Sequence, residues 1–368
     1  MSWANGYSRC VLVTLNVHPS SNLSAFPNLV IGINGSTPFP PFAQFADVAH
    51  GGYVQHTVTL LGQTVPADLI FTSDAAGTTL LSWEIESWNN ATGAIVAWVN
   101  SDRLAASDTL VYAWIGKSSV TTYQCTASAT WDGNYIGVWH LGNGSVLSGI
   151  DSTDKSHNAT TVTAGVATGQ IDGAALFDGT SAKQVTQATV ADYQMGAQNW
   201  TVEMWVKPSA NIGGNYVGLI GQGTYQVNGW YWTISPTGIL YCATESGGVD
   251  LPIYTAAGVV AIGVWQHFVG VRNGLTTGII YKNGAPVTTY GSLITPANSA
   301  FPFYIGTDSA VHWVTGPVDE VRISNTNRSA NWIAHEYRQQ AQASAFFAVT
   351  DLGSGISIPL LLEAYGDY

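Results

Sequence analysis

Two glutamates in one predicted strand are the clearest candidates for chemistry. They are Glu84 and Glu86, in the segment WEIESW at residues 83–88. Because alternate side chains of a strand point to the same face, the two carboxyls would lie side by side. A retaining glycoside hydrolase uses two carboxyls about 5–5.5 Å apart. An ordinary strand with a solvent-facing or packed polar side produces the same pattern, and we favour that interpretation.

Other catalytic motifs are missing from the sequence. There is no G-x-S-x-G nucleophile elbow, no H-E-x-x-H helix and no P-loop. The eight histidines are scattered, and His140 and His267 lie in strand-like segments that favour core or cross-strand positions. We therefore expect a protein that is not an enzyme, with a glycoside hydrolase as the less favoured alternative.

Aromatic residues offer a second kind of site, because flat rings are platforms for sugars. Trp230 and Trp232 in the segment NGWYW share one face of a predicted strand, and Tyr231 points to the other. Tyr225 and Trp313 are further candidates. One face of the strand should pack in a core, so only part of this set can bind a ligand.

The composition predicts a folded, all-β chain. Charged residues make up only 9% of the 368 residues, but 14 Trp, 17 Tyr and 11 Phe need a core in which to pack. The 40 Gly and 14 Pro indicate many short strands joined by tight turns.

The charge balance and the apolar runs exclude two classes of partner. A net charge of −12 argues against binding to nucleic acid, which selects a basic surface. No run approaches the roughly 20 apolar residues of a membrane span, so we expect no membrane insertion. The N-terminal residues lack the basic and apolar regions of a signal peptide.

The three cysteines cannot all pair within one molecule. They are Cys10, Cys125 and Cys242. A bridge between Cys10 and Cys125 is one alternative, and buried free thiols are the one we favour.

Strand-like runs recur about every 10–14 residues, a spacing typical of β-sandwiches. A Ser/Thr-rich segment at 118–135 separates two series of such runs. We expect two β-sandwich domains at 1–127 and 128–343, followed by a tail or closing strand at 344–368. The hairpin turn Asn283–Gly284, a short helix at 42–50 and one convincing helix at 329–340, capped by Ser329, complete the prediction.

Eight segments of the second half resemble the LamG-like branch of the concanavalin A-like lectin/glucanase superfamily. The resemblance covers roughly residues 136–340 and implies a two-sheet jelly roll. The segments, in order, are GVWHLGNG (137–144), DSTDKSHNAT (151–160), GQIDGAALFDG (169–179), WTVEMWVKP (200–208), WQHFVGVRNG (265–274), IIYKNGAPV (279–287), YIGT (304–307) and GPVDEVRISNTNRSANWI (316–333).

The first half resembles a bacterial and phage β-domain of unknown function that often precedes a LamG-like domain. The resemblance is carried by segments AFPNLVIGI (25–33), 66–99 and TLVYAWIG (109–116). The Phe-rich SAFFAV (344–349) matches the segment that often follows the jelly roll in such proteins.

The resemblance to the LamG-like family also implies a calcium site. It places Asp178 and Asp319 on neighbouring strands, where they would hold one structural Ca²⁺ together with the Gly179 carbonyl, Asp151 and water. The alternative gives both aspartates structural roles: Asp178 caps a turn, and Asp319 pairs with an arginine, either Arg322 or Arg328.

These features lead us to expect a non-enzymatic structural or adhesion protein displayed on a surface. The favoured setting is a phage virion, as a decoration, fibre or tail-associated component. Its partners would be other virion proteins or copies of itself in a homo-oligomer, and glycans of a host cell surface. The alternative is a secreted bacterial carbohydrate-binding adhesin, located extracellularly or on the cell surface.

Overall fold

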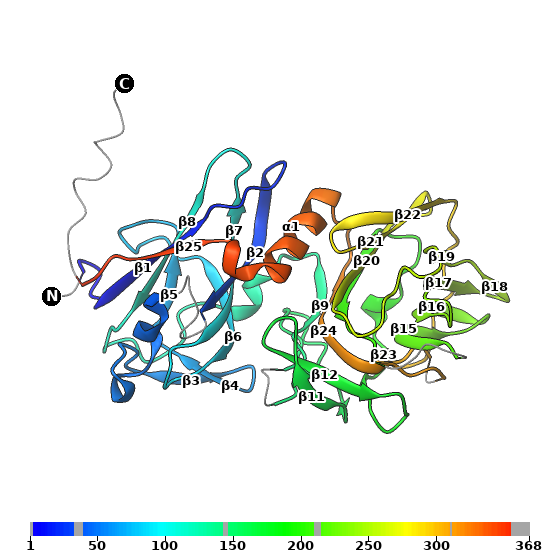
Figure 1. Ribbon diagram of the computed structural model, residues 1–368, viewed down its shortest axis with the longest axis horizontal. Coiled ribbons are helices and arrows are strands. Elements are labelled where there is room, and N and C mark those ends of the chain that lie inside the picture. The colour runs from blue at the N-terminus through cyan, green and yellow to red at the C-terminus, as the bar shows by residue number, and fades with distance from the viewer. Residues whose placement is uncertain (1–2, 33–39, 143–145, 210–214, 310, 355–368) are drawn as a thin grey trace. The chain divides into compact units, whose positions relative to one another are not determined.

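The computed structural model describes residues 3–32, 40–142, 146–209, 215–309 and 311–354. Over these residues the chain is all-β with one α-helix near its C-terminal end, as the sequence predicts. It forms two compact units, the first from residues 1–130 and 342–368 and the second from residues 131–341 (Figure 1). The segment after the second unit therefore returns to the first.

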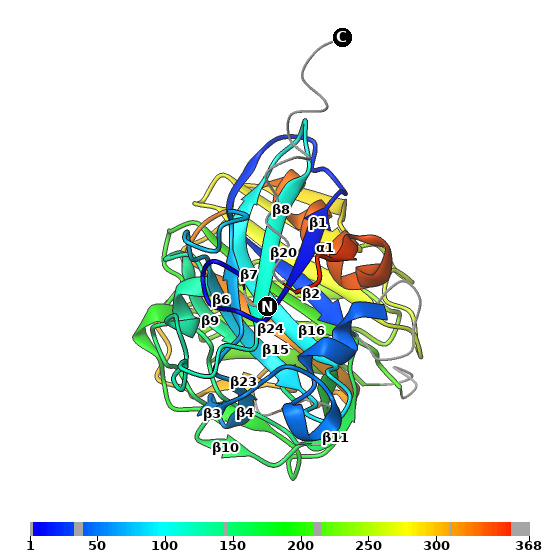
Figure 2. The ribbon, with the colours of Figure 1, turned by 90° about the vertical axis from the view of Figure 1, so that its left-hand side faces the viewer.

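The first unit contains two sheets and a hairpin. One sheet has the strand order β25-β1-β8-β5, the other has the order β2-β7-β6, and β3 pairs with β4 (Figures 1 and 2). Side chains of both sheets meet in one core, with Val13 and Trp114 from the first sheet and Trp83 and Val99 from the second. The strands are β1 (Arg9–Leu15), β2 (Leu23–Gly32), β3 (Thr57–Leu60), β4 (Gln63–Pro66), β5 (Ile70–Thr72), β6 (Ser82–Trp88), β7 (Ile95–Arg103), β8 (Thr109–Ile115) and β25 (Ala348–Asp351).

Within the segment that follows the second unit, residues 348–351 form a closing strand, and residues 355–368 of the predicted tail lie outside the described residues. β25 pairs antiparallel with β1, with Val13 opposite Val349. Just before it, Phe346 and Phe347 are buried in the core of the first unit, and the Arg103 guanidinium lies 5.0 Å from the centre of the Phe346 ring. The expected helix at 42–50 is replaced by two 3₁₀ turns, Pro40–Phe45 and Val48–His50, because Asp47 caps the second turn by accepting a hydrogen bond from the His50 amide.

The second unit consists of two larger sheets. One has the order β10-β13-β23-β15-β16-β17-β18, with β19 beside β17, and we call it the front sheet. The other, the back sheet, has the order β11-β12-β24-β14-β20-β21-β22, with β9 beside β24. The strands are β9 (Tyr135–Trp139), β10 (Thr161–Val162), β11 (Gly165–Thr168), β12 (Gly173–Asp178), β13 (Val185–Gln187), β14 (Trp200–Val206), β15 (Val217–Thr224), β16 (Asn228–Ile234), β17 (Leu240–Ser246), β18 (Val249–Asp250), β19 (Ile253–Tyr254), β20 (Gln266–Asn273), β21 (Thr277–Lys282), β22 (Ala285–Gly291), β23 (Phe303–Ile305) and β24 (Thr315–Ser324).

The core of the second unit lies between the inner faces of these sheets. Trp230 and Trp232 of the front sheet pack with Phe268 and Val321 of the back sheet. The large indole of Trp232 fits because its neighbour across the core is Gly270, where an added Cβ would lie 2.5 Å from the Trp232 ring. At this point of the core, a large side chain of one sheet therefore packs against a glycine of the other, which keeps the core dense.

A single α-helix, α1 (Ala330–Ala341), covers the outer face of the back sheet. Its side chain Ile333 packs with Val269, Val271 and Tyr281, which point away from the core. The Ser329 hydroxyl accepts a hydrogen bond from the Trp332 amide, so the predicted cap is confirmed.

The predicted Asn-Gly hairpin is confirmed. The hairpin β21–β22 turns at Asn283 and Gly284, both with positive φ, as an Asn-Gly turn requires.

Among the residues that the structure describes, no helix is both long and apolar enough to cross a membrane.

We expect the closing strand to stabilise the first unit. Phe346→Ala should lower the free energy of unfolding of this unit by about 3–5 kcal/mol, because it leaves a cavity in a closed core. Thr350→Ala, an exposed change in β25 itself, is the matched control. Calorimetric melting of both variants checks this, and equal melting temperatures for the two would contradict a role of Phe346 in the core.

Candidate functional site

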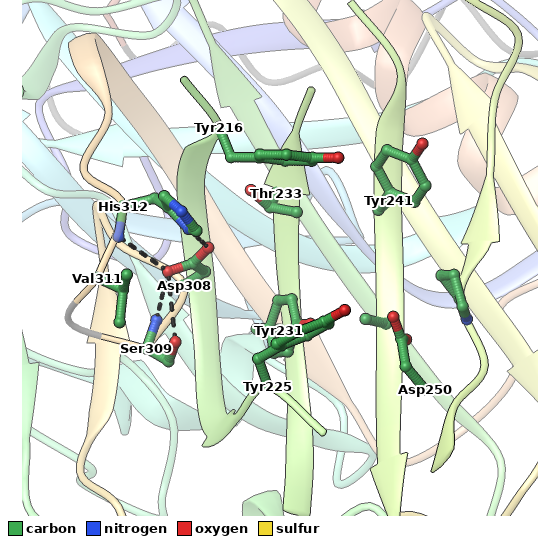
Figure 3. A pocket seen from close by; sticks show the side chains of 12 residues that line it. Tyr216, Tyr225, Tyr231, Thr233, Tyr241, Asp250, Asp308, Ser309, Val311 and His312 are labelled. Atoms are coloured by element: carbon green, nitrogen blue, oxygen red, sulfur yellow. Dashed lines mark hydrogen bonds and ion pairs between the residues drawn. The ribbon is translucent and has the colours of Figure 1, made fainter. Parts of the chain in front are cut away.

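A pocket of about 460 Å³ opens on the outer face of the front sheet (Figure 3). We call it the tyrosine pocket, because four of its twelve lining residues are tyrosines. The lining residues are Tyr216, Tyr225, Tyr231, Thr233, Tyr241, Ala243, Asp250, Pro252, Asp308, Ser309, Val311 and His312.

Strand alternation decides which residues reach the pocket. On β16, Trp230 and Trp232 point into the core, so Tyr231 and Thr233 point outward. On β17, Cys242 is in the core and Tyr241 faces the pocket. The same alternation places Ala243 between Tyr241 and Glu245 on the outer face, and its small side chain leaves room for the cavity.

Two glycines let the loop after β23 lie against the sheet and form one wall of the pocket. A Cβ at Gly218 would lie 2.2 Å from the backbone nitrogen of Asp308, and one at Gly221 would lie 2.7 Å from the Asp308 oxygen. Real Cβ atoms do not approach backbone so closely, so this wall depends on glycine at both positions. The loop is therefore positioned by residues about 90 positions earlier in the chain.

The wall itself is organised around Asp308. Its Oδ1 accepts hydrogen bonds from the amides of Ser309 and His312, and its Oδ2 lies 2.6 Å from Nδ1 of His312. These bonds orient the His312 ring beside Tyr216, with ring centres 5.7 Å apart.

A buried carboxyl lies beneath the tyrosines. Glu245 accepts hydrogen bonds from the Tyr231 hydroxyl at 2.8 Å and from the Gln226 amide at 2.9 Å. Asp250 of the pocket is its partner on the neighbouring strand β18. Burial raises the pKa of Glu245 to about 7 and also raises the pKa of Asp250. The two carboxyls therefore hold a proton at pH values where isolated carboxyls are ionised.

A row of aromatic rings continues from the pocket across the surface. The ring centres of Tyr216 and Tyr241 are 6.3 Å apart, those of Tyr241 and Tyr254 are 5.5 Å apart, and those of Tyr254 and Tyr290 are 5.2 Å apart. Tyr216 and Tyr254 are more than two-fifths exposed. We call Tyr216, Tyr241, Tyr254 and Tyr290 the tyrosine row.

The structure separates the four aromatic residues predicted as ligand contacts. Tyr225 lines the pocket, whereas Trp230 and Trp232 are buried in the core, where the Trp230 indole donates to the Tyr193 carbonyl. Trp313 forms a bridge with Thr307 and is not among the lining residues. The two buried tryptophans are corrections, because the larger rings gain more from the core than Tyr231 does.

The sequence contains one signal that could have predicted some of the pocket residues not named in the sequence analysis. If Trp230 and Trp232 point inward, Tyr231 must point outward, and Tyr241 of the paired strand β17 follows. Asp250, Asp308 and His312 carried no such signal, because a loop and a two-residue strand position them.

The predicted calcium ligands do not form one group. Asp178 lies opposite Thr315 on β24, and Asp319 is four residues further along that strand, a separation of about 13 Å along the strand direction. Asp178 is exposed and accepts hydrogen bonds from the amide and hydroxyl of Thr180, which is the predicted turn-capping role. The Gly179 amide donates to the Val314 carbonyl.

The other two carboxylates are buried and bind main-chain amides. Asp319 accepts from the amides of Gln170 and Ile171 on one oxygen and from the Glu320 amide on the other. Asp151 accepts from Val138, Thr153 and His157. By binding these amides, the two carboxylates hold the neighbouring loops in place.

The glutamate pair in β6 does not face an open cleft. Glu84 is 2% exposed and Glu86 is 5% exposed, and the Trp98 indole donates to Glu86 at 2.8 Å. The three cysteines are free thiols, and Cys125 donates to the Trp83 carbonyl. A bond between Cys10 and Cys125 is therefore not part of this structure.

Calcium binding stays a prediction, and melting tests it together with the anchor role of Asp319. Asp319→Ala should lower the free energy of unfolding by about 2–4 kcal/mol, because buried amides lose their acceptor. Asp178→Ala, at an exposed turn, is the matched control. We expect the Asp319→Ala loss to be the same with calcium and with EDTA; a calcium-dependent rise in wild-type melting temperature that this variant lacks would instead make Asp319 a metal ligand.

Comparison with known proteins confirms the predicted superfamily for the second unit. Residues 178–334 match the family model described as the concanavalin A-like lectin/glucanases superfamily. A search of curated protein sequences found no match.

Several solved structures match part of the chain at low identity. The binding domain of Paraclostridial mosquitocidal protein 1 matches with 13% identity and a TM-score of 0.47, over 56% of this chain and 52% of that one. The binding domain of botulinum neurotoxin serotype G matches with 17% identity and a TM-score of 0.45, over 57% and 52%. The serotype D ligand-binding domain, solved with N-acetylneuraminic acid, matches with 14% identity and a TM-score of 0.45, over 56% and 51%. The matched part is about half of each of these chains, and the likeness concerns the fold alone.

Proposed function

We propose that the second unit, whose residues 178–334 match the family model of the concanavalin A-like lectin/glucanases superfamily, binds a glycan in the tyrosine pocket. The observation that carries this proposal is the pocket itself: four tyrosines and two aspartates line one cavity on the open face of the front sheet. Its volume of about 460 Å³ lies within the range of small-ligand sites.

The lining suits a sugar because a sugar has an apolar ring face and a polar rim. Tyrosine rings offer flat apolar surfaces and a hydroxyl at the tip. Asp250 adds an acceptor for sugar hydroxyls, whereas Asp308 and Thr233 are hydrogen-bonded within the chain and make the wall polar. A purely apolar ligand would leave the Asp250 carboxylate without a donor.

The tyrosine row supports a ligand longer than one sugar. Tyr254 and Tyr290 continue the aromatic surface beyond the pocket lining, onto β19 and β22. An exposed apolar surface of this kind is a mark of a binding site. We infer that one sugar unit occupies the pocket and that its neighbours lie along the row.

Binding without hydrolysis is the activity that the carboxyls support. Glu245 is fully buried and bonded to Tyr231 and Gln226, so it does not face a substrate. Both oxygens of Asp308 interact with the loop that it organises. Of the two glutamates in β6 of the first unit, Glu86 accepts a hydrogen bond from the Trp98 indole. A glycoside hydrolase needs two carboxyls that reach the scissile bond, and Glu245 and Asp308 are instead bonded to the chain itself.

Substitution of the pocket tyrosines tests the proposed function. On a glycan array, the full chain should be retained by at least one oligosaccharide, and Tyr216→Ala and Tyr241→Ala should each weaken that binding about tenfold or more, because a stacking surface is lost. Phe301→Ala, an exposed aromatic change outside the pocket, is the matched control. Retention by no glycan at all, or equal binding by all variants, would overturn the proposal.

The setting of this binding unit is a second part of the proposal. We propose that the chain is a surface-displayed component of a phage virion, in which the first unit makes contacts with copies of itself or with other virion proteins. The support is the low fraction of charged residues, 9%, which suits close packing against like neighbours, and the resemblance of the first half to a phage β-domain.

The oligomeric state of the purified chain tests this setting. We expect a defined homo-oligomer in light scattering and electron microscopy, since a virion component carries its assembly contacts on its surface. The oligomeric state is measured on the full chain, because the proposed assembly contacts involve the first unit. A chain that stays monomeric at all concentrations but is retained on glycans would favour the secreted adhesin instead.

A further inference from the structure

The tyrosine pocket contains negative charge that the surrounding chain does not neutralise. Asp250 and Asp308 line it, and Glu245 lies beneath. Its lining contains no lysine or arginine, and the sequence has none between Lys207 and Arg272 or between Lys282 and Arg322, the segments that form the pocket. The basic ring in the lining, His312, is bonded to Asp308.

One carboxylate oxygen in this pocket is ready for a donor. The Oδ1 atom of Asp250 is buried and receives no hydrogen bond from an N–H or O–H group in the described part of the chain, so the proton that Asp250 shares with Glu245 is the donor that the chain itself can offer. A buried acceptor without a donor is costly, and a ligand that donates there removes that cost. Among the lining residues, Asp250 is therefore the group whose bonding a ligand would complete.

The neighbouring Glu245 makes the need for positive charge stronger. Glu245 and Asp250 are directly opposite on paired strands, where like charges repel. Burial, together with this repulsion, raises the pKa of Glu245 to about 7, so the pair keeps a proton. A bound cation can replace that proton and stabilise both carboxylates.

The tyrosines decide which kind of cation fits. A metal ion such as Ca²⁺ needs six to eight oxygen ligands, whereas much of this pocket is aromatic surface. Tyrosine faces instead attract organic ammonium groups by cation–π interaction. Figure 3 shows Tyr216 and Tyr241 on one side of the pocket and Tyr225, Tyr231 and Asp250 on the other.

We propose that the sugar bound in the tyrosine pocket carries a positively charged amino group, as a hexosamine without its N-acetyl group does. The ammonium group donates to Asp250 and lies among the tyrosine faces. A sugar with a carboxylate would meet Asp250, Asp308 and Glu245 and be repelled. This inference rests on the proposed function and names the ligand class for the same site.

Matched oligosaccharides test the charge of the ligand. The full chain is titrated calorimetrically at pH 6 with a tetramer of β-1,4-linked glucosamine and with the same tetramer fully N-acetylated. We expect the amine form to bind about tenfold tighter or more, as a desolvated cation–π contact and a charge-assisted hydrogen bond imply.

Substitutions separate the role of charge from the role of stacking. Asp250→Asn should weaken binding of the amine tetramer about tenfold or more and leave the acetylated form unchanged. Asp154→Asn removes an exposed carboxylate that pairs with Lys155 away from the pocket, and should change neither. Tyr216→Ala should weaken both forms, because both stack.

The outcomes distinguish this inference from the function on which it rests. If the acetylated tetramer binds as tightly as the amine, or if Asp250→Asn affects both forms equally, the charge inference is overturned and glycan binding stands. If the chain binds neither tetramer and no glycan on an array, both are overturned. Tighter binding of the amine, lost in Asp250→Asn alone, supports both.

The pH dependence gives a second readout. A tetramer with trimethylated amines keeps its charge at every pH, so only the protein titrates. Binding should be tighter at pH 8 than at pH 5, because the raised pKa values of Glu245 and Asp250 leave the pair protonated at pH 5. The other titratable groups that face the pair or the pocket are Tyr216, Tyr225, Tyr231, Tyr241, Asp308 and His312. Equal binding at both pH values would contradict contact between the cation and this pair.

Discussion

The second unit depends on one buried guanidinium. Arg322 on β24 is 1% exposed and forms ion pairs with Glu320 of its own strand, with Glu336 of α1 and, at 3.7 Å, with Glu203 of β14. Removing one partner of a buried ion pair typically costs about 3–5 kcal/mol, because it leaves a charge without compensation. Arg322 therefore fixes the helix on the outer face of the back sheet, together with the packing of Ile333.

This arrangement makes the two outer faces of the jelly roll different. The back sheet is covered by α1, so its outward residues Val269 and Tyr281 are buried. The front sheet has no such helix among the described residues, and its outward Tyr231 and Tyr241 line a pocket. The front sheet can therefore offer a binding surface that the covered back sheet cannot. Its side chains point outward because alternate residues of a strand face opposite sides of the sheet.

Local signals in the sequence predicted the elements well and the site only in part. The Asn283–Gly284 turn and the Ser329 cap depend on neighbours within a few residues, so single positions reveal them. Asp178 and Asp319 were assigned correctly to paired strands, but strand pairing alone does not determine register, and the register puts them four residues apart. The wall at Asp308 was not predictable, because Gly218 admits it through a contact distant in sequence.

The two groups of buried carboxyls show how the chain treats the same physical problem differently. On the back sheet, Glu320 and Glu336 are neutralised by Arg322, which lies between them, and burial raises the pKa of the nearby Glu203. Near the tyrosine pocket, Glu245 and Asp250 face each other without an arginine or lysine in the adjoining segments. A carboxyl pair that serves only the fold would gain from an internal cation as the first group does. Because the segments around Glu245 and Asp250 provide no such cation, their negative charge is compensated by a proton or by a positively charged ligand of the pocket.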